Sequence, residues 1–226
     1  MELEIKLTAM PEAPVDPVEI LVQLAGLPDL EGRYLLGAAT PVTIRDLYYD
    51  TPDRRLRQAR VGMRVRIQDG QPWITVKRSV RRDGGLAQRE EFEQRLDRES
   101  LGRAVALLQE DGLLPPEARP MVDALLAGEP TGGLEPVLLT ETRRVSRPVL
   151  RLPGRLPVAT LSLDRVVYRN VRGEPVFHDV EVEALADTGE EVLRELESLL
   201  VQAAGGYLKP AGESKLARGL RLLGEI

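Results

Sequence analysis

The sequence predicts an α+β fold in which about eight β-strands close into a barrel and the helices pack outside it. Three observations lead to this prediction. Charged and apolar residues alternate in segment after segment, which gives each strand one charged face. Helical segments lie between the strands along the chain and can cover only the apolar faces. Closure then places the charged faces around a wet lumen.

The opening segment shows this alternation most simply. Glu2, Glu4 and Lys6 share one face of a strand, and the apolar residues between them share the other. Alone, this stretch fits an edge strand with a solvated face equally well. The repetition of the pattern favours the barrel.

The other elements follow in order. Further strands are predicted over Ile44–Asp50, Val61–Gln68, Pro72–Ser79, Gln88–Leu96, Val137–Arg147, Val158–Asn170 and Pro175–Ala184. Helices are predicted over Pro17–Ala25, Leu101–Asp111, Met121–Ala127 and Leu185–Ala203, with a last one from near Glu213 to near Gly224. Asp16 and Ser100 are the expected N-caps of two of them. Residues 26–41 are rich in Gly and Pro and are expected to form a loop.

Composition restricts the chemistry. The chain has 226 residues, treated as a single domain over 1–226, with a net charge of −5 that argues against a nucleic-acid partner. It has no cysteine, and its one histidine, His178, is a poor basis for a metal site or for acid–base catalysis. No apolar run approaches the roughly 18–20 residues of a membrane span, so no membrane contact is expected and the cytoplasm is the expected compartment.

The predicted lumen gathers charges of both signs. The basic side chains on its face are Lys6, Arg64, Arg66, Lys77, Arg89 and Arg143, and the acidic ones are Glu2, Glu4, Glu91, Glu93, Asp164, Glu181 and Glu183. Such crowding costs stability unless a ligand is bound. Basic groups favour a polyanion, whereas clustered carboxylates favour a hard divalent cation.

Simpler interpretations remain for single residues. Arg64, Arg66 and Lys77 could form an ion-pair network with glutamates across the strands. Arg144 opposes Arg143 in parity and is expected to be structural. His178 is out of phase with the lumen face and is expected at the surface. Asp179 is in phase and is expected at the mouth of the tunnel.

The motifs together resemble the CYTH family, also called the triphosphate tunnel metalloenzymes. In the family's order they are Glu2-x-Glu4-x-Lys6, Tyr48-Tyr49-Asp50-Thr51, Arg64-x-Arg66, Lys77, Arg89-x-Glu91-x-Glu93, Thr142-Arg143, Asp164, Glu181-x-Glu183 and Ser214-Lys215. Each is weak alone, but nine in order across residues 2–215 are specific. The resemblance implies an eight-stranded antiparallel tunnel that binds a linear triphosphate with Mg²⁺ or Mn²⁺.

The resemblance also implies an activity and a division of roles. Hydrolysis of inorganic triphosphate to pyrophosphate and phosphate is expected, with a class IV adenylate cyclase, a thiamine triphosphatase or a non-catalytic binder as alternatives. The substrate-binding set would be Lys6, Arg64, Arg66, Lys77, Arg89, Arg143 and Lys215. One metal ion would lie on Glu2 and Glu4, and a second near Asp164, Glu181 and Glu183, with Glu91 and Glu93 completing the acidic set. Lys6 and Glu4 would act on the attacking water. A homodimer is left open.

Overall fold

The computed structural model describes residues 1–224, which form eleven strands and six helices. The strands are β1 (Glu2–Ala9), β2 (Asp29–Leu30), β3 (Tyr34–Leu36), β4 (Thr40–Asp50), β5 (Val61–Gln68), β6 (Gln71–Asp83), β7 (Leu86–Arg95), β8 (Glu135–Arg151), β9 (Leu156–Tyr168), β10 (Val176–Ala184) and β11 (Leu208–Pro210). The helices are α1 (Pro17–Gly26), α2 (Arg55–Gln58), α3 (Arg98–Glu110), α4 (Val122–Ala127), α5 (Glu190–Ala203) and α6 (Lys215–Leu222). No helix among these residues is long and apolar enough to cross a membrane.

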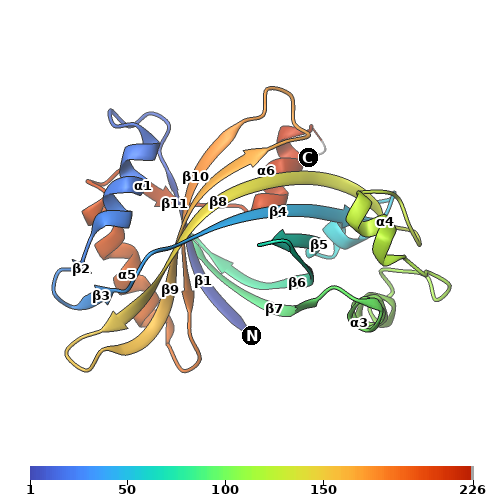
Figure 1. Ribbon diagram of the computed structural model, residues 1–226, viewed down its shortest axis with the longest axis horizontal. Coiled ribbons are helices and arrows are strands. Elements are labelled where there is room, and N and C mark those ends of the chain that lie inside the picture. Colours follow the sequence, from blue (N-terminus) through green and yellow to red (C-terminus); the bar gives the residue numbers. More distant parts are fainter. Residues whose placement is uncertain (225–226) are drawn as a thin grey trace.

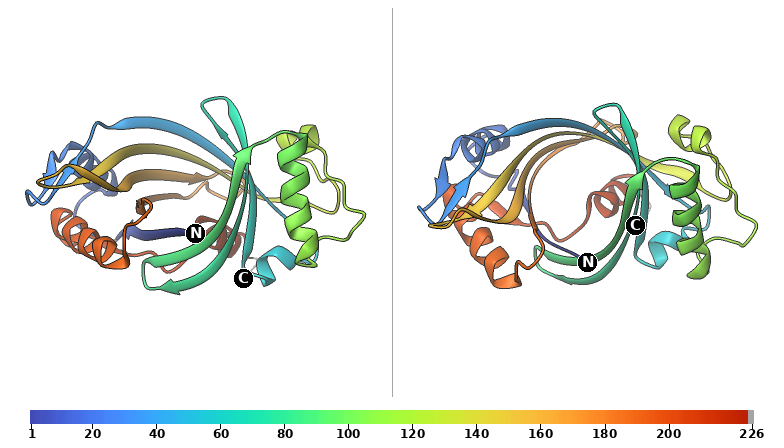
Figure 2. Two further views of the ribbon diagram at one scale, coloured as in Figure 1. Left: turned by 90° about the horizontal axis from the view of Figure 1, so that it is seen from below. Right: turned by 60° about the horizontal axis from the view of Figure 1, so that its bottom comes forward.

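Eight of the strands form a closed antiparallel barrel. Their order is β8-β4-β5-β6-β7-β1-β10-β9, and β9 pairs with β8 to complete the ring. Figure 2 shows this ring nearly end-on. The predicted fold class is therefore confirmed. Closure satisfies the backbone hydrogen bonds of every barrel strand and leaves the charged faces inside.

Three short strands were not predicted. β2 and β3 form a hairpin on the edge of β8, within the stretch expected to be a loop, and β11 pairs with the end of β1. With only two or three residues each, they are too short to show an alternation. They extend the barrel wall and do not contribute to its lumen.

Two helix starts differ from the predictions. Asp97, and not Ser100, caps α3, because its side chain accepts from the Ser100 backbone N–H at 2.8 Å while the Ser100 hydroxyl accepts from the Asp97 N–H at 3.0 Å. The fifth helix begins at Glu190 and not at Leu185, since the Leu185 N–H is bonded to the Val158 carbonyl. Both errors lie at element ends, where periodicity carries little information.

Helices cover the outward apolar faces in two places. α1 and α5 pack on β1, β9 and β10 through residues such as Leu24 and Leu196. At the other end of the molecule, α3 and α4 cover β4 to β7 through residues such as Leu108 and Leu125. Figure 1 shows these helices at opposite ends of the barrel. With the apolar faces buried outside, the opposite faces of the same strands are left to line the interior.

The last helix, α6, closes one side of the interior. Its Leu220 packs in a small cluster with Tyr48, Leu138 and Tyr168. Gly219 lies so close to β8 that a Cβ atom there would clash with the Leu138 methyl groups. The helix therefore lies directly on the inner surface of the strands, and its first residues enter the cavity described next.

Candidate functional site

The barrel encloses a cavity of about 430 Å³. Within the described part of the chain, ten basic and seven acidic side chains line it. The basic ones are Lys6, Arg57, Arg60, Arg64, Arg66, Lys77, Arg82, Arg89, Arg144 and Lys215, and the acidic ones are Glu2, Glu4, Glu91, Glu93, Glu181, Glu183 and Glu213. The cavity thus carries a positive excess although the whole chain is negative. Such a pocket concentrates anions.

Arg64 and Arg66 are held on β5 by a buried carboxylate from the neighbouring strand. Arg66 donates to both oxygens of Asp46, at 2.8 and 3.1 Å, and the Arg64 guanidinium lies 3.7 Å from it. Burial alone would raise the pKa of Asp46, but the charges of Arg64 and Arg66 lower it to about 2. Asp46 therefore stays ionised and orients the two guanidinium groups. Asp46 was not among the predicted lumen residues, although it shares a strand face with Tyr48, a residue of the family motif.

A second cluster surrounds Asp164 and Glu181. Arg144 donates to both oxygens of Asp164, at 2.7 and 2.6 Å, and to Glu181 at 2.6 Å. Lys215 reaches both carboxylates at 2.7 Å, and Lys6 lies 2.6 Å from Glu181. Burial opposes ionisation, yet Lys215, Lys6 and Arg144 hold the pKa of Glu181 well below its usual range. Both carboxylates are therefore already neutralised by cations.

This cluster separates Asp164 from the other two carboxylates of the predicted second metal site, Glu181 and Glu183, which line the cavity. Asp164 is fully buried, does not line the cavity, and has both oxygens bonded to Arg144 and Lys215. Glu181 is engaged by three cations. A metal ion at Asp164 would have to displace Arg144 or Lys215, whereas Glu181 lines the cavity and its metal role stays a prediction. In this arrangement Asp164 and Glu181 position the basic side chains that face the lumen.

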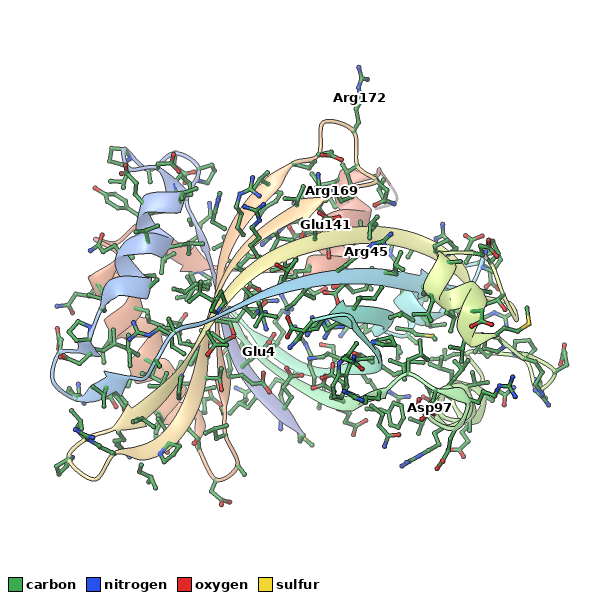
Figure 3. The ribbon with its side chains drawn as sticks, viewed as in Figure 1. Glu4, Arg45, Asp97, Glu141, Arg169 and Arg172 are labelled. Carbon is green, nitrogen blue, oxygen red and sulfur yellow. The ribbon has the colours of Figure 1, made fainter. Side chains whose placement is uncertain are left out.

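Arg143 is not in the lumen, and Arg144 is. Arg143 is exposed on the outer face of β8, in register with Thr43 and Arg165. Arg45 and Glu141, labelled in Figure 3, mark the same outer face of β4 and β8. Arg144 faces inward because its cross-strand neighbour is Asp164. The two arginines face opposite sides of β8, as predicted, but Arg144 and not Arg143 lines the cavity.

Glutamates form the wall of the cavity that lies across the barrel from Arg64 and Arg66. Glu4 and Glu183 are cross-strand neighbours on β1 and β10, and Lys77 bridges Glu2 at 2.8 Å and Glu91 at 3.1 Å. Burial and the charges of Glu2, Glu91 and Glu4 raise the pKa of Glu183 to about 7. Within residues 1–224 no three acidic or histidine side chains converge as a preformed metal site. The donor set nevertheless suits a hard cation, since one bound ion would relieve the repulsion that shifts Glu183.

This shift gives a pH prediction. Between about pH 4.5 and 7 the folded protein keeps a proton on Glu183 that the unfolded chain releases, so stability falls as pH rises through this window. Glu183→Gln should remove that fall and raise the melting temperature at pH 8, measured with EDTA, but not at pH 4.5. Glu93→Gln is a control for which the opposite change is expected. Burial opposes ionisation of Glu93, but the charge of Arg64 lowers its pKa overall, so the ionised form stabilises the fold and this variant should lose stability at pH 8. A Glu183→Gln melting temperature below wild type at pH 8 would contradict the assignment.

Asp179 and His178 are adjacent on β10 and face opposite sides of the strand. Asp179 does not lie at a tunnel mouth: it is fully buried and paired with Arg218 at 2.9 Å. His178 lies opposite Arg165 on the outer side of β10, as its phase predicts, but it is half-buried and less exposed than expected. Lys215, Lys6, Lys77 and the other predicted lumen residues line the cavity, apart from Arg143 and Asp164.

Comparison with known proteins fits this geometry. The model of the CYTH domain matches residues 20–219. The chain belongs to the CYTH family. The predicted resemblance is therefore confirmed, whereas the extent of the domain over 1–226 stays a prediction, and residues 225 and 226 lie outside the described part.

Solved structures share the CYTH barrel. A candidate adenylyl cyclase from Hippeastrum, described as having a dominant triphosphatase activity, is 20% identical with a TM-score of 0.63, over 98% of this chain and 96% of that one. A candidate adenylate cyclase from Bacillus halodurans is 20% identical with a TM-score of 0.56, over 96% of each chain. A Pyrococcus horikoshii protein is 19% identical with a TM-score of 0.53, over 99% of each chain. At these identities the likeness shows a common fold.

Proposed function

We propose that this CYTH protein is a metal-dependent triphosphatase that hydrolyses inorganic triphosphate to pyrophosphate and phosphate. The observation that carries the proposal is the cavity inside the barrel, which is lined by ten basic side chains and a wall of glutamates. Family membership supports an enzyme that acts on triphosphates with a metal ion, and the activity described for the Hippeastrum protein agrees with it. The choice of inorganic triphosphate rests on the lining of the cavity.

The basic side chains bind and orient the phosphate chain. Arg64 and Arg66 are fixed by Asp46, so their remaining N–H groups are preorganised donors. Arg144 on β8 and Lys215 on α6, held by Asp164 and Glu181, add positive charge to the cavity beside the Arg64 and Arg66 pair. In the reaction these groups neutralise the charge that grows on the leaving pyrophosphate.

The glutamate wall is where a divalent ion would be held. Glu2, Glu4 and Glu183, with Glu91 beside them, supply the oxygen ligands that Mg²⁺ or Mn²⁺ prefers. When bound, such an ion withdraws charge from phosphate oxygens and makes a bound water more acidic. Glu93 lies apart from this wall, because it accepts from Thr75 and faces Arg64.

Lys6 and Glu4 lie where an attacking water could be oriented. Lys6 Nζ is 2.6 Å from Glu181 and lies on the same face of β1 as Glu4. The Glu4 Oε1 atom is buried, lies 2.8 Å from Arg89 and has no donor in hydrogen-bonding geometry. A bound water or cation at this point would supply the partner that this oxygen lacks. In the proposed reaction Lys6, which lines the same cavity, keeps the water beside the phosphate chain.

The lining of the cavity favours a substrate without an organic group. Tyr48 is the one aromatic side chain that lines it within residues 1–224. Trp73 stacks with Arg95 at the start of β6 and does not reach the cavity. Adenine and thiamine rings are usually held by stacking and by amide or backbone hydrogen bonds. The described lining offers little of either.

Product analysis tests the proposal. The protein is incubated with inorganic triphosphate, ATP or thiamine triphosphate, each with Mg²⁺, with Mn²⁺ or with EDTA, and the products are separated by ion chromatography. Phosphate and pyrophosphate should form fastest from inorganic triphosphate, and only with metal. Cyclic AMP from ATP would establish a cyclase instead. No turnover of any substrate would leave a binding protein and overturn the proposal.

Glu4→Gln should separate metal binding from phosphate binding. The amide keeps the size of the side chain but is a poorer ligand for a hard cation, so this variant should need more Mg²⁺ for half-maximal rate, and excess metal should restore part of it. Arg66→Ala should lose rate without rescue by metal, because its defect lies in phosphate contact. The measurement is rate against free Mg²⁺ for both variants. Wild-type midpoints in both curves would show that Glu4 is not a metal ligand.

A further inference from the structure

Arg82 and Arg89 carry positive charge at one end of the cavity, at a distance from the Arg64 and Arg66 pair. Arg89 on β7 lies opposite Ser79 of β6, whereas Arg64 lies opposite Thr75, four residues earlier on that strand. The backbone positions of Arg89 and Arg64 are therefore about 13 Å apart along the barrel wall, since each strand residue adds about 3.3 Å. Arg82, near the end of β6, lines the cavity at the Arg89 end.

A β-bulge turns Arg82 inward. Simple alternation from Lys77 would place Arg81 in the lumen, but the register between β6 and β7 shifts between Ser79 and Arg81. Val80 is the extra residue, so Arg82 lies opposite Ala87 and joins the lumen face. Arg81 points outward, where it is 55% exposed and pairs with Glu190. A bulge that re-aims a side chain into a cavity is typical of a binding site.

The positive charge at this end is only partly compensated. Arg89 is about nine-tenths buried, contacts Glu4 at 2.8 Å through one nitrogen, and leaves its buried Nη2 without a hydrogen-bond partner. Arg82 makes one long hydrogen bond, 3.4 Å, to the Ala211 carbonyl. Partial burial and the nearby charge of Arg89 lower the pKa of Arg82, although its side chain stays exposed where it lines the cavity. Glu213, the acidic neighbour on the loop, is engaged by Arg221 at 2.7 Å.

The first turn of α6 faces the same end. Ser214 caps the helix by accepting from the Ala217 N–H at 3.1 Å, and residues 212–217 line the cavity. First-turn N–H groups, such as those of Lys215 and Leu216, have no acceptor within a helix. They point toward the N-terminal end of the helix, where the dipole also favours an anion.

We propose that Arg82, Arg89 and the first turn of α6 form a second phosphate subsite, which holds one end of a phosphate chain whose other end lies against Arg64 and Arg66. This rests on the proposed function. A chain of two phosphates occupies the Arg64 end alone. Chains of three or more reach the second subsite, and Arg82 therefore makes the cavity sensitive to chain length.

Binding without turnover tests the subsite. Pyrophosphate, triphosphate and tetraphosphate are titrated calorimetrically, in EDTA, into wild-type protein and the Arg82→Ala, Arg82→Gln and Arg81→Ala variants. Both Arg82 variants should bind triphosphate and tetraphosphate about tenfold more weakly, the value expected for one charge-assisted hydrogen bond, and pyrophosphate less than twofold more weakly. Arg81→Ala, the adjacent arginine that points outward, should match wild type for all three.

The outcomes separate the two proposals. Wild-type protein that fails to bind triphosphate in EDTA would overturn the subsite, whereas the proposed function is metal-dependent and is tested by the product analysis. Wild-type binding that Arg82 variants leave unchanged, or weaken equally for all three chains, would overturn the subsite alone. Thermal unfolding of each variant is compared with wild type, and the Gln variant, which keeps most of the side chain, shows whether a loss reports on charge and not on packing.

Discussion

Replacing Arg218 by alanine should lower the free energy of unfolding by about 3–5 kcal/mol, the cost of leaving one charge of a buried pair alone. Arg218 is 3% exposed and donates to both oxygens of Asp179, at 3.0 and 2.9 Å, and Asp179 is fully buried. The guanidinium also lies 4.4 Å from the centre of the Phe177 ring. Urea denaturation of the variant measures the loss.

Two variants make this result specific. Asp179→Asn combined with Arg218→Ala removes the stranded charge and should recover part of the loss. Arg221→Ala removes an arginine from the same helix, but that side chain is 50% exposed in its pair with Glu213, so the loss should stay below about 1 kcal/mol. Equal losses from Arg218→Ala and Arg221→Ala would show that the buried pair does not hold α6 in the barrel.

Arg144→Ala should weaken the binding of triphosphate by about tenfold to a hundredfold, whereas Arg143→Ala should leave it unchanged. One charge-assisted hydrogen bond accounts for roughly the lower figure, and two for the higher one. The two residues are adjacent in sequence, carry the same charge and face opposite sides of β8. Calorimetric titration of triphosphate in EDTA measures both variants against wild type.

Stability must be followed in the same variants, because Arg144 also neutralises Asp164 and Glu181. Lys215 still reaches both carboxylates in Arg144→Ala, so the fold should survive with a lower melting temperature. A loss of affinity in Arg143→Ala with none in Arg144→Ala would contradict the inward orientation of Arg144.

The sequence by itself determined the barrel. A strict alternation of charged and apolar residues identifies a strand and its two faces from neighbouring residues alone, and the strand over Val61–Gln68 was predicted with its observed bounds. Repetition of that pattern requires an enclosed charged surface, and the order of the motifs identified the family. Lys6, Arg64 and Lys77 could be assigned to the cavity because each belongs to an uninterrupted alternation.

Only the tertiary structure decided which charges meet. Arg143 and Arg144 are equivalent by composition, and Arg144 is distinguished by its register with Asp164, twenty residues away on the next strand. Arg82 enters the lumen through a bulge that alternation does not reveal. Asp164, predicted as a metal ligand, contacts Arg144 and also Lys215, which comes from a helix 51 residues later. Cross-strand register and the docking of α6 depend on contacts between distant segments, so a local pattern does not contain them.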